Sequence, residues 1–295
     1  MSDIVVKVNR DSNDPFKKWG IDHLSASKIN QWRESPSNFI LNNILKLKQP
    51  PSLKMFMGSS AETILKKLLF GEIYENDIDK EATADFKNRT MFVGKPEDQE
   101  KILKDIIGYK GRNKTYKGLV RNAFELLKGF GKPSGTQRKI KFRFKFWPID
   151  IIGFLDFSYD QDTQGKKRDI DLKTSGQKWS SVPRGNRLQM CIYKFADPSR
   201  EQNICFVTKE HQMFYVLEDT YEESLEEIYY IINSMAIALT ECNHINDLIL
   251  RYMPDIDFWK FSQEHREKLK DLLKQAHKKT YKDIIDEREF ERGIS

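Results

Sequence analysis

The residue types best suited to chemistry in this chain are two aspartates and a lysine. Asp156 ends the apolar run Ile-Gly-Phe-Leu, and Asp171 and Lys173 follow in the run Asp-Leu-Lys-Thr. Side chains alternate between the faces of a β-strand, so Asp171 and Lys173 share a face with Cα atoms roughly 6.5 Å apart. Two carboxylates suit a hard divalent cation such as Mg²⁺ or Mn²⁺. The alternative for the Asp-x-Lys pair alone is a surface salt bridge between neighbouring strands.

Two further patterns flank this group. Gln189 and Tyr193 are four residues apart, which places them on one face of an expected helix. Upstream, Met57 and Gly58 open another expected helix, with Glu62 four residues after the glycine. The alternatives are a polar pair at a strand edge for Gln189 and Tyr193, and a solvated helix position for Glu62.

The order Gly-x-x-x-acid, Gly-x-x-Asp, Asp-x-Lys-Thr and Gln-x-x-x-Tyr resembles the PD-(D/E)xK nuclease superfamily, specifically its RecB-like exonuclease branch. The segments 24–29 and 35–39 are similar to the start of that branch, so the resemblance covers residues 24–196. It implies a mixed α/β fold with a restriction-endonuclease-like core of order αβββαβ. Helices are expected to flank a mixed central sheet, with a helical insertion and C-terminal helices added to it.

A metal would serve the chemistry that this resemblance implies. A phosphodiester repels nucleophiles by its own charge, and a divalent ion neutralises that charge and lowers the pKa of bound water. Asp156 and Asp171 are expected ligands, because an ion relieves the repulsion between neighbouring carboxylates. The resemblance adds the backbone carbonyl of Leu172. Many RecB-like nucleases have histidine where this chain has Glu62, whose carboxylate would favour Mg²⁺.

Three other side chains complete the expected catalytic group. Lys173 would position or activate the attacking water and stabilise the transition state. Gln189 and Tyr193 would hydrogen-bond the substrate phosphate or brace the lysine. Gln137 lies just before the first expected strand, at a position where the branch often has glutamate, so its role stays open.

The segment 176–187 combines cations, glycines and an aromatic residue next to the expected site. Lys178, Arg184 and Arg187 could grip phosphates, and Trp179 could stack on an unpaired base. Simple packing is the alternative for a lone tryptophan. The basic face of the alternating run 138–146 and the lysine-rich last helix are further candidate DNA surfaces, although such patterns are more typical of solvated faces.

Composition sets outer limits on the protein. The 295 residues can bury one substantial core, and 50 Lys and Arg against 44 Asp and Glu give a net charge of +6, which suits a polyanion partner without requiring one. No apolar run approaches the roughly 20 residues of a membrane span. The polar start is unlike a signal peptide. We therefore expect a protein of the cytoplasm, or of the host cytoplasm if a phage encodes it.

The cysteines bear on the cofactor. Cys191, Cys205 and Cys242 are far apart, so neither a zinc site nor a disulfide framework is indicated, and buried apolar positions are expected. Several RecB-like relatives hold an iron–sulfur cluster with four cysteines, the first of which corresponds to Ser35 here. No cluster is expected, and Ser35 should cap a helix that begins at Pro36.

Hydrophobic periodicity predicts the elements that position these residues. Strands are expected at 138–146, 150–159, 168–174, 203–208 and 212–217. Helices are expected at 26–34, 36–47, 59–70, 98–107, 119–128, 183–196, 221–241 and 258–281. We divide the chain into an N-terminal arm with helices (1–71), a helical insertion (72–135), a nuclease core (136–218) and a C-terminal helical region (219–295), together forming one catalytic domain.

The sequence thus predicts a metal-dependent deoxyribonuclease, and an exonuclease of recombination, repair or DNA degradation in preference to an endonuclease. The resemblance also implies a stand-alone phage-type enzyme. A structure-specific or flap endonuclease could use the same chemistry. A catalytically idle DNA-binding subunit is the alternative from another class. Expected partners are DNA, a single-strand annealing or recombination protein, and further copies of the chain.

Overall fold

The computed structural model describes residues 14–47, 53–90, 115–175, 178–208, 210–217, 221–252, 263 and 266–276. The chain divides into two units, one of residues 1–49, 142–151 and 226–295, and the other of residues 50–141 and 152–225. Every residue expected in the catalytic group belongs to the second of these units.

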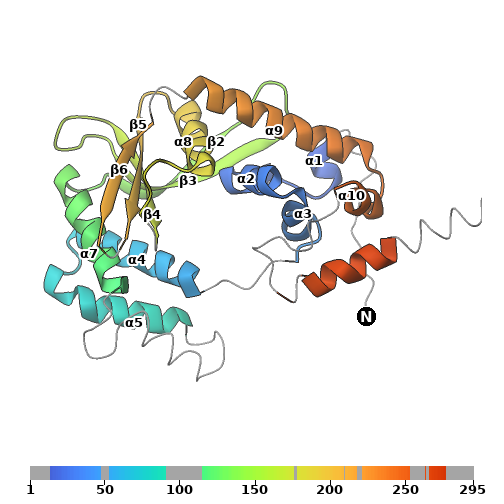
Figure 1. Ribbon diagram of the computed structural model, residues 1–295. Helices are drawn as coiled ribbons and strands as arrows, with labels where there is room; N and C mark the ends of the chain where they lie inside the picture. The colour runs from blue at the N-terminus through green and yellow to red at the C-terminus, as the bar shows by residue number, and fades with distance from the viewer. Residues whose placement is uncertain are drawn as a thin grey trace, which may run out of the picture. The chain divides into compact units, whose positions relative to one another are not determined.

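The elements are labelled in Figure 1. The strands β1 to β6 span His23–Leu24, Gly135–Phe142, Asp150–Tyr159, Arg168–Thr174, Glu201–Val207 and Gln212–Val216. The α-helices α1 to α5 span Pro15–Lys18, Ala26–Glu34, Pro36–Phe39, Leu53–Phe70 and Ile78–Thr90, and α7 to α10 span Thr115–Leu127, Arg184–Ala196, Tyr221–Glu241 and Ile245–Arg251. A π-helical turn covers Ile40–Ile44, and short 3₁₀ turns cover Glu75–Asp77 and Lys128–Phe130.

The sheet is mixed, as predicted. Its strand order is β1-β3-β4-β5-β6, and β2 pairs with β3. Strands β3 and β4 are antiparallel, β4 and β5 are parallel, and β5 and β6 are antiparallel. Helix α8 connects the parallel pair, as a crossover between parallel strands requires. The core order αβββαβ is therefore present as α4, β2, β3, β4, α8 and β5.

Helices cover both faces of the sheet in the second unit (Figure 1). Helices α4 and α7 pack on one face, where Leu65, Leu119 and Leu127 meet Phe157 and Cys205. Against the other face, Met190 of α8 packs on β5. Burying apolar surface on both faces stabilises the strands that carry the expected site.

Strands β3 and β4 have the bounds that the sequence predicts, whereas β2 differs. It begins at Gly135 and ends at Phe142 instead of reaching residue 146. The chain turns back there, and Arg143 pairs with Asp150 across the turn at 2.8 Å. The strand therefore ends before the last apolar residue of the alternating run, and Phe146 is 75% exposed.

Several helices also depart from expectation. Helix α4 begins at Leu53, so Gly58 lies within it instead of preceding it. The helix expected over 36–47 is α3 followed by a π-helical turn. Residues 98–107 and much of 258–281 lie outside the described residues, although 266–276 is helical.

Two smaller predictions are confirmed. Ser35 caps α3, because its hydroxyl accepts a hydrogen bond from the Asn38 N–H at 3.2 Å and Pro36 occupies the first helical position. Cys191, Cys205 and Cys242 are buried and free. No helix among the described residues has the length and apolar character to cross a bilayer.

Candidate active site

The first part of the site forms where β3 and β4 part. Their register pairs Phe157 with Ile170, and one position further along lie Asp156 and Asp171. Here the Leu172 N–H donates a hydrogen bond to Oδ2 of Asp156 at 2.8 Å. A side-chain carboxylate, and not a backbone carbonyl of β3, is thus the acceptor. The two aspartates are therefore brought together at the point where the strands diverge.

Lys173 lies beside Asp171, and their Nζ and Oδ2 atoms are 2.6 Å apart. The other oxygen of Asp171 accepts a hydrogen bond from Gln189 Nε2 at 2.9 Å. The same nitrogen lies 2.8 Å from the Tyr193 hydroxyl, and this hydroxyl donates to the backbone carbonyl of Phe154 at 3.1 Å. The predicted pair on α8 thus braces Asp171 and ties it to β3.

Two glycines of the recognised motifs allow these close approaches. A Cβ at Gly153 would lie 2.6 Å from the Tyr193 ring, so only glycine lets that ring rest on β3. A Cβ at Gly58 would lie 3.2 Å from Oγ1 of Thr174. Helix α4 can therefore approach the end of β4 at this position.

Glu62 reaches the site from α4 through an intermediary. Its Oε1 accepts a hydrogen bond from Gln137 Nε2 at 2.5 Å, and the same nitrogen donates to Asp156 Oδ1 at 3.1 Å. Gln137 thus links Glu62 to Asp156. The neighbouring ends of β3 and β4 bring Asp156 close to Asp171 and Lys173, so the three expected carboxylates and the lysine form one group. The role of Gln137 stayed open in the sequence, because the chain has glutamine where the RecB-like branch often has glutamate.

The site concentrates negative charge in a partly buried place. Burial and the nearby carboxylates of Asp171 and Glu62 raise the pKa of Asp156 to about 8. Burial also raises the pKa of Glu62, against the opposing effect of its hydrogen bond from Gln137. An additional positive charge would relieve this accumulation.

Lys173 and Tyr193 both keep their protons. Burial acts to lower the pKa of Lys173, but the surrounding carboxylates, led by Asp171, outweigh it and the net pKa is raised. Burial raises the pKa of Tyr193. Lys173 is thus suited to stabilise negative charge as a cation, and Tyr193 to donate a hydrogen bond.

The donors present fit a hard divalent cation. Oδ2 of Asp171 is buried and, within the described part of the chain, makes no hydrogen bond beyond its ion-pair contact with Lys173. Carboxylate oxygens are what Mg²⁺ and Mn²⁺ prefer. In this arrangement no three acidic, His or Cys side chains of the described residues yet converge on one point. The Gln137 amide lies between two of the carboxylates instead.

The sequence also matches a family model, described as the PD-(D/E)XK nuclease superfamily, over residues 23–292. The chain belongs to the PD-(D/E)XK nuclease superfamily. Membership implies a nuclease that depends on a divalent metal such as Mg²⁺ or Mn²⁺ and acts on DNA.

Other comparisons add little to this assignment. A solved structure described as "Crystal structure of SSO0001" is similar over 60% of this chain and 88% of that one, with 17% sequence identity and a TM-score of 0.30. A TM-score this low is not evidence of a shared function. A search of curated proteins gives no significant match.

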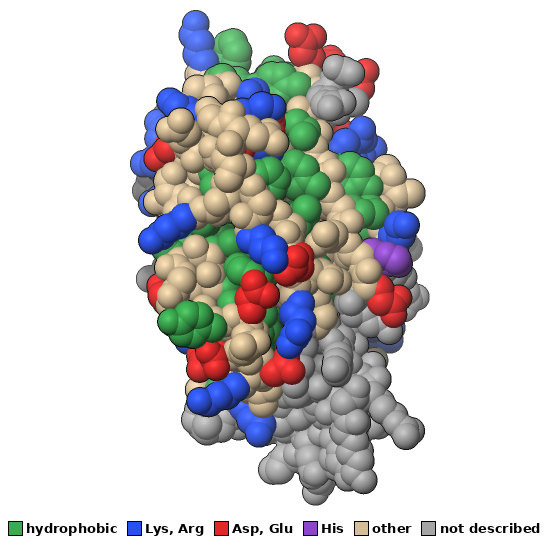
Figure 2. All heavy atoms as spheres, turned by 90° about the vertical axis from the view of Figure 1, so that its left-hand side faces the viewer, with side chains coloured by type: hydrophobic (Ala, Val, Ile, Leu, Met, Phe, Trp, Pro, Cys, Tyr) green, Lys and Arg blue, Asp and Glu red, His purple; other side chains and the backbone are tan. Residues whose placement is uncertain are grey.

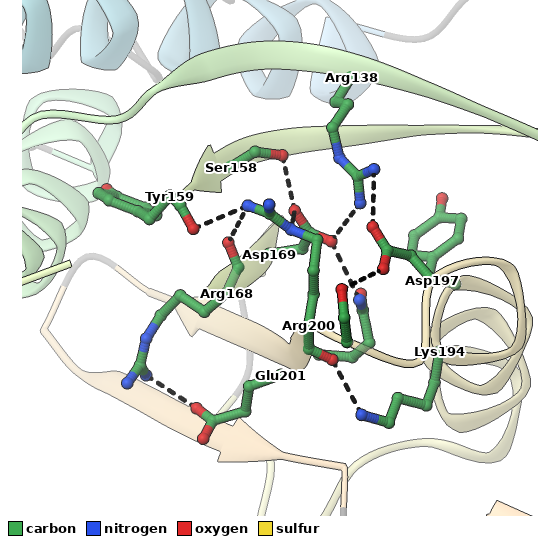
Figure 3. A network of polar contacts seen from close by, with 12 residues as sticks. Arg138, Ser158, Tyr159, Arg168, Asp169, Lys194, Asp197, Arg200 and Glu201 are labelled. Atoms are coloured by element: carbon green, nitrogen blue, oxygen red, sulfur yellow. Dashed lines mark hydrogen bonds and ion pairs between the residues drawn. The ribbon is translucent and has the colours of Figure 1, made fainter. Parts of the chain in front are cut away.

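Within this PD-(D/E)XK core, Asp169 lies in a polar network of its own (Figure 3). It is fully buried, and its carboxylate is bound by Arg138 at 2.6 Å and Arg200 at 3.0 Å. Ser158 and Gln202 donate further hydrogen bonds to it at 2.7 and 3.0 Å. Basic and polar side chains therefore occupy the carboxylate of Asp169, whereas Asp171 remains available to the site.

The four side chains expected to contact DNA follow β4 in the PD-(D/E)XK core. Lys178 and Arg184 are exposed, whereas Arg187 is half-buried with an Nε that makes no hydrogen bond among the described residues. The Trp179 ring lies 6.1 Å from that of Phe206 and is 37% exposed. Trp179 therefore packs in part, while retaining an accessible portion.

Proposed function

We propose that this PD-(D/E)XK protein is a RecB-like, divalent-metal-dependent deoxyribonuclease that degrades DNA from its ends. The observation that carries the proposal is the contact of Asp171 with both Lys173 and Gln189. It joins the Asp-x-Lys motif to the Gln-x-x-x-Tyr motif, the combination on which the RecB-like resemblance rests. A catalytically idle subunit would have no need to keep this arrangement intact.

Each side chain has a task in the proposed reaction. A bound Mg²⁺ or Mn²⁺ would neutralise the scissile phosphate and acidify water. Asp156, Asp171 and Glu62 would hold the ion, together with the carbonyl of Leu172. Because Lys173 keeps its proton, it would orient the attacking water and stabilise the charge that develops on the phosphate oxygens.

The residues of α8 would act indirectly. Gln189 donates to Oδ1 of Asp171 and would orient that carboxylate toward the ion. The Tyr193 hydroxyl accepts a hydrogen bond from Gln189 and donates one to the β3 backbone, so it connects the two. Such supporting hydrogen bonds orient metal ligands, and their loss commonly lowers metal affinity or activity about 10- to 100-fold.

We place the DNA track along residues 178–187, beside the end of β4. Lys178 and Arg184 support this choice, since both side chains are exposed and could contact phosphates. The face drawn in Figure 2, toward which α7 and β6 lie in Figure 1, is a poorer candidate. Its coloured Lys and Arg side chains are interspersed with Asp and Glu.

The setting is proposed from the resemblance alone. We assign the protein to recombination, repair or degradation of DNA in the cytoplasm, as a stand-alone enzyme of phage type. A single-strand annealing or recombination protein is the proposed partner, and assembly of several copies around the substrate is the proposed oligomer.

The decisive experiment compares end-labelled linear DNA with covalently closed circular DNA in Mg²⁺ or Mn²⁺. Asp171→Asn serves as the matched inactive control. Digestion of linear DNA alone is expected. Cutting of circles or of flap junctions would replace the exonuclease with an endonuclease, and binding without any cutting would replace both with an idle subunit.

A further inference from the structure

Gln137 lies at the centre of the carboxylate group, although no motif includes it. Its side-chain nitrogen donates to Glu62 across 75 sequence positions and to Asp156 across 19. One neutral amide thus joins the carboxylates of α4 and β3. A cation that bound both acids would need to occupy much the same place.

The backbone holds Gln137 in an unusual conformation. Its φ of 51° lies in the left-handed region, which residues other than glycine seldom adopt. The next residue, Arg138, is anchored by ion pairs to Asp169 at 2.6 Å and to Asp197 at 3.2 Å. Strained backbone persists where its surroundings determine it, and it is common at functional sites.

The orientation of the amide follows from its neighbours. The NH₂ group of the amide faces Glu62 and Asp156 and donates a hydrogen bond to an oxygen of each. The same NH₂ group would face a bound cation with its positive end. Rotation about the last side-chain bond exchanges the nitrogen with Oε1 without moving the backbone.

We infer that Gln137 is a residue of the metal site with two working orientations. In the metal-free protein its NH₂ group holds Glu62 and Asp156 together. When Mg²⁺ or Mn²⁺ binds, the amide turns and presents Oε1, an oxygen donor of the kind these ions accept. This inference rests on the proposed metal site and adds to it a residue that sets affinity for the ion.

The proposal can be tested by binding and stability, without measuring cleavage. Gln137→Met keeps the length of the side chain and removes both the donor and the oxygen. Gln137→Glu supplies an oxygen but no donor. Gln212→Met, at an exposed position of β6, is the matched control for the same chemical change.

Two measurements on each protein are needed, thermal unfolding in chelator and calorimetric titration with Mn²⁺. Gln137→Met should unfold at a lower temperature than wild type without metal and bind Mn²⁺ about tenfold more weakly. Gln137→Glu should also be less stable without metal, because it adds a fourth carboxylate, yet it should bind Mn²⁺ more tightly than wild type. Gln212→Met should match wild type in both.

The outcomes that overturn the inference are distinct. If Gln137→Met has the thermal stability and Mn²⁺ affinity of wild type, Gln137 takes no part in the metal site. Tighter Mn²⁺ binding by Gln137→Met would show that the amide only competes with the ion and never turns toward it. If wild type and Asp171→Asn both fail to bind Mn²⁺, the metal site itself is wrong, and the inference fails with it.

Discussion

Gly153 and Tyr193 are packed so closely that a single methyl group on Gly153 would lie 2.6 Å from the tyrosine ring. The Tyr193 hydroxyl in turn bonds the Phe154 carbonyl and lies within hydrogen-bonding distance of Gln189 Nε2. The Gly-x-x-Asp motif and the Gln-x-x-x-Tyr motif, although separate in the sequence, are therefore in direct contact. A change in either should reach Asp171 through Gln189.

This contact predicts the effect of Gly153→Ala. The added methyl group must displace the Tyr193 ring, and overpacking of this kind costs about 1–3 kcal/mol. Nuclease activity should fall with stability, because Gln189 loses its support. Urea unfolding and a cleavage assay would measure both. Gly135→Ala, where nothing lies within 4 Å of the added Cβ, is the control and should be stable. An unchanged Gly153→Ala protein would contradict the proposed coupling.

Lys173 and Asp171 should differ in what their removal costs. Asp171→Ala should abolish both metal binding and cleavage while the protein stays folded. Lys173→Ala should leave metal binding largely intact and slow single-turnover cleavage by about two orders of magnitude or more, since it removes a charge that acts in the transition state. Equal cleavage rates for Lys173→Ala and wild type would make Lys173 a structural ion-pair residue.

The raised pKa of Asp156 predicts a specific pH dependence. Between its usual value of 3.8 and about 8, the native carboxyl keeps a proton that the unfolded chain has lost. The metal-free protein should therefore lose stability as the pH rises through this window. Metal must displace the proton, so affinity for Mn²⁺ should increase with pH up to about 8.

Calorimetric titrations between about pH 6 and pH 8 would check this expectation, with Asp156→Asn as the reference protein. The asparagine variant has no proton to displace at this position, so its residual affinity should depend less on pH. A wild-type affinity that does not change with pH would show that Asp156 is ionised before metal arrives.

Salt dependence can locate the DNA track. Binding should weaken steeply with salt, because each neutralised phosphate releases a condensed counterion. Replacing Lys178, Arg184 and Arg187 together by serine should reduce the slope of log affinity against log salt, and replacing Lys139 and Lys141 in β2 should not. The opposite result would move the track to the basic face of β2.

How far the sequence predicts this protein varies along the chain. Strands β3 and β4 were predicted to the residue, since apolar runs and clear turns bound both. Strand β1 escaped prediction because its two residues, His23 and Leu24, are too few to show any periodicity. Strand β2 was extended too far, because the pattern of alternating residues continues into the turn after Phe142.

The site shows the same contrast. Residues joined by regular spacing, such as Gln189 and Tyr193, could be assigned to one helix face and do lie together. The choice of Asp171 over Asp169 could not come from alternation, which puts both on one face. The spacing of the resembled family favours Asp171, and the physical reason is that Arg138 and Arg200, from distant parts of the chain, bind the Asp169 carboxylate. The bridging role of Gln137 likewise depends on a backbone angle that no pattern encodes.

The 75 positions between Glu62 and Gln137 have a consequence for how the protein folds. Asp156, Asp171 and the bracing residues of α8 belong to one continuous stretch of strands and helix, whose short loops close at low entropic cost. Glu62 must arrive from far outside that stretch. We expect the amides of β3, β4 and α8 to gain protection first in pulsed hydrogen exchange. Helix α4, which carries Glu62, should gain protection later, when it packs on the sheet that has formed.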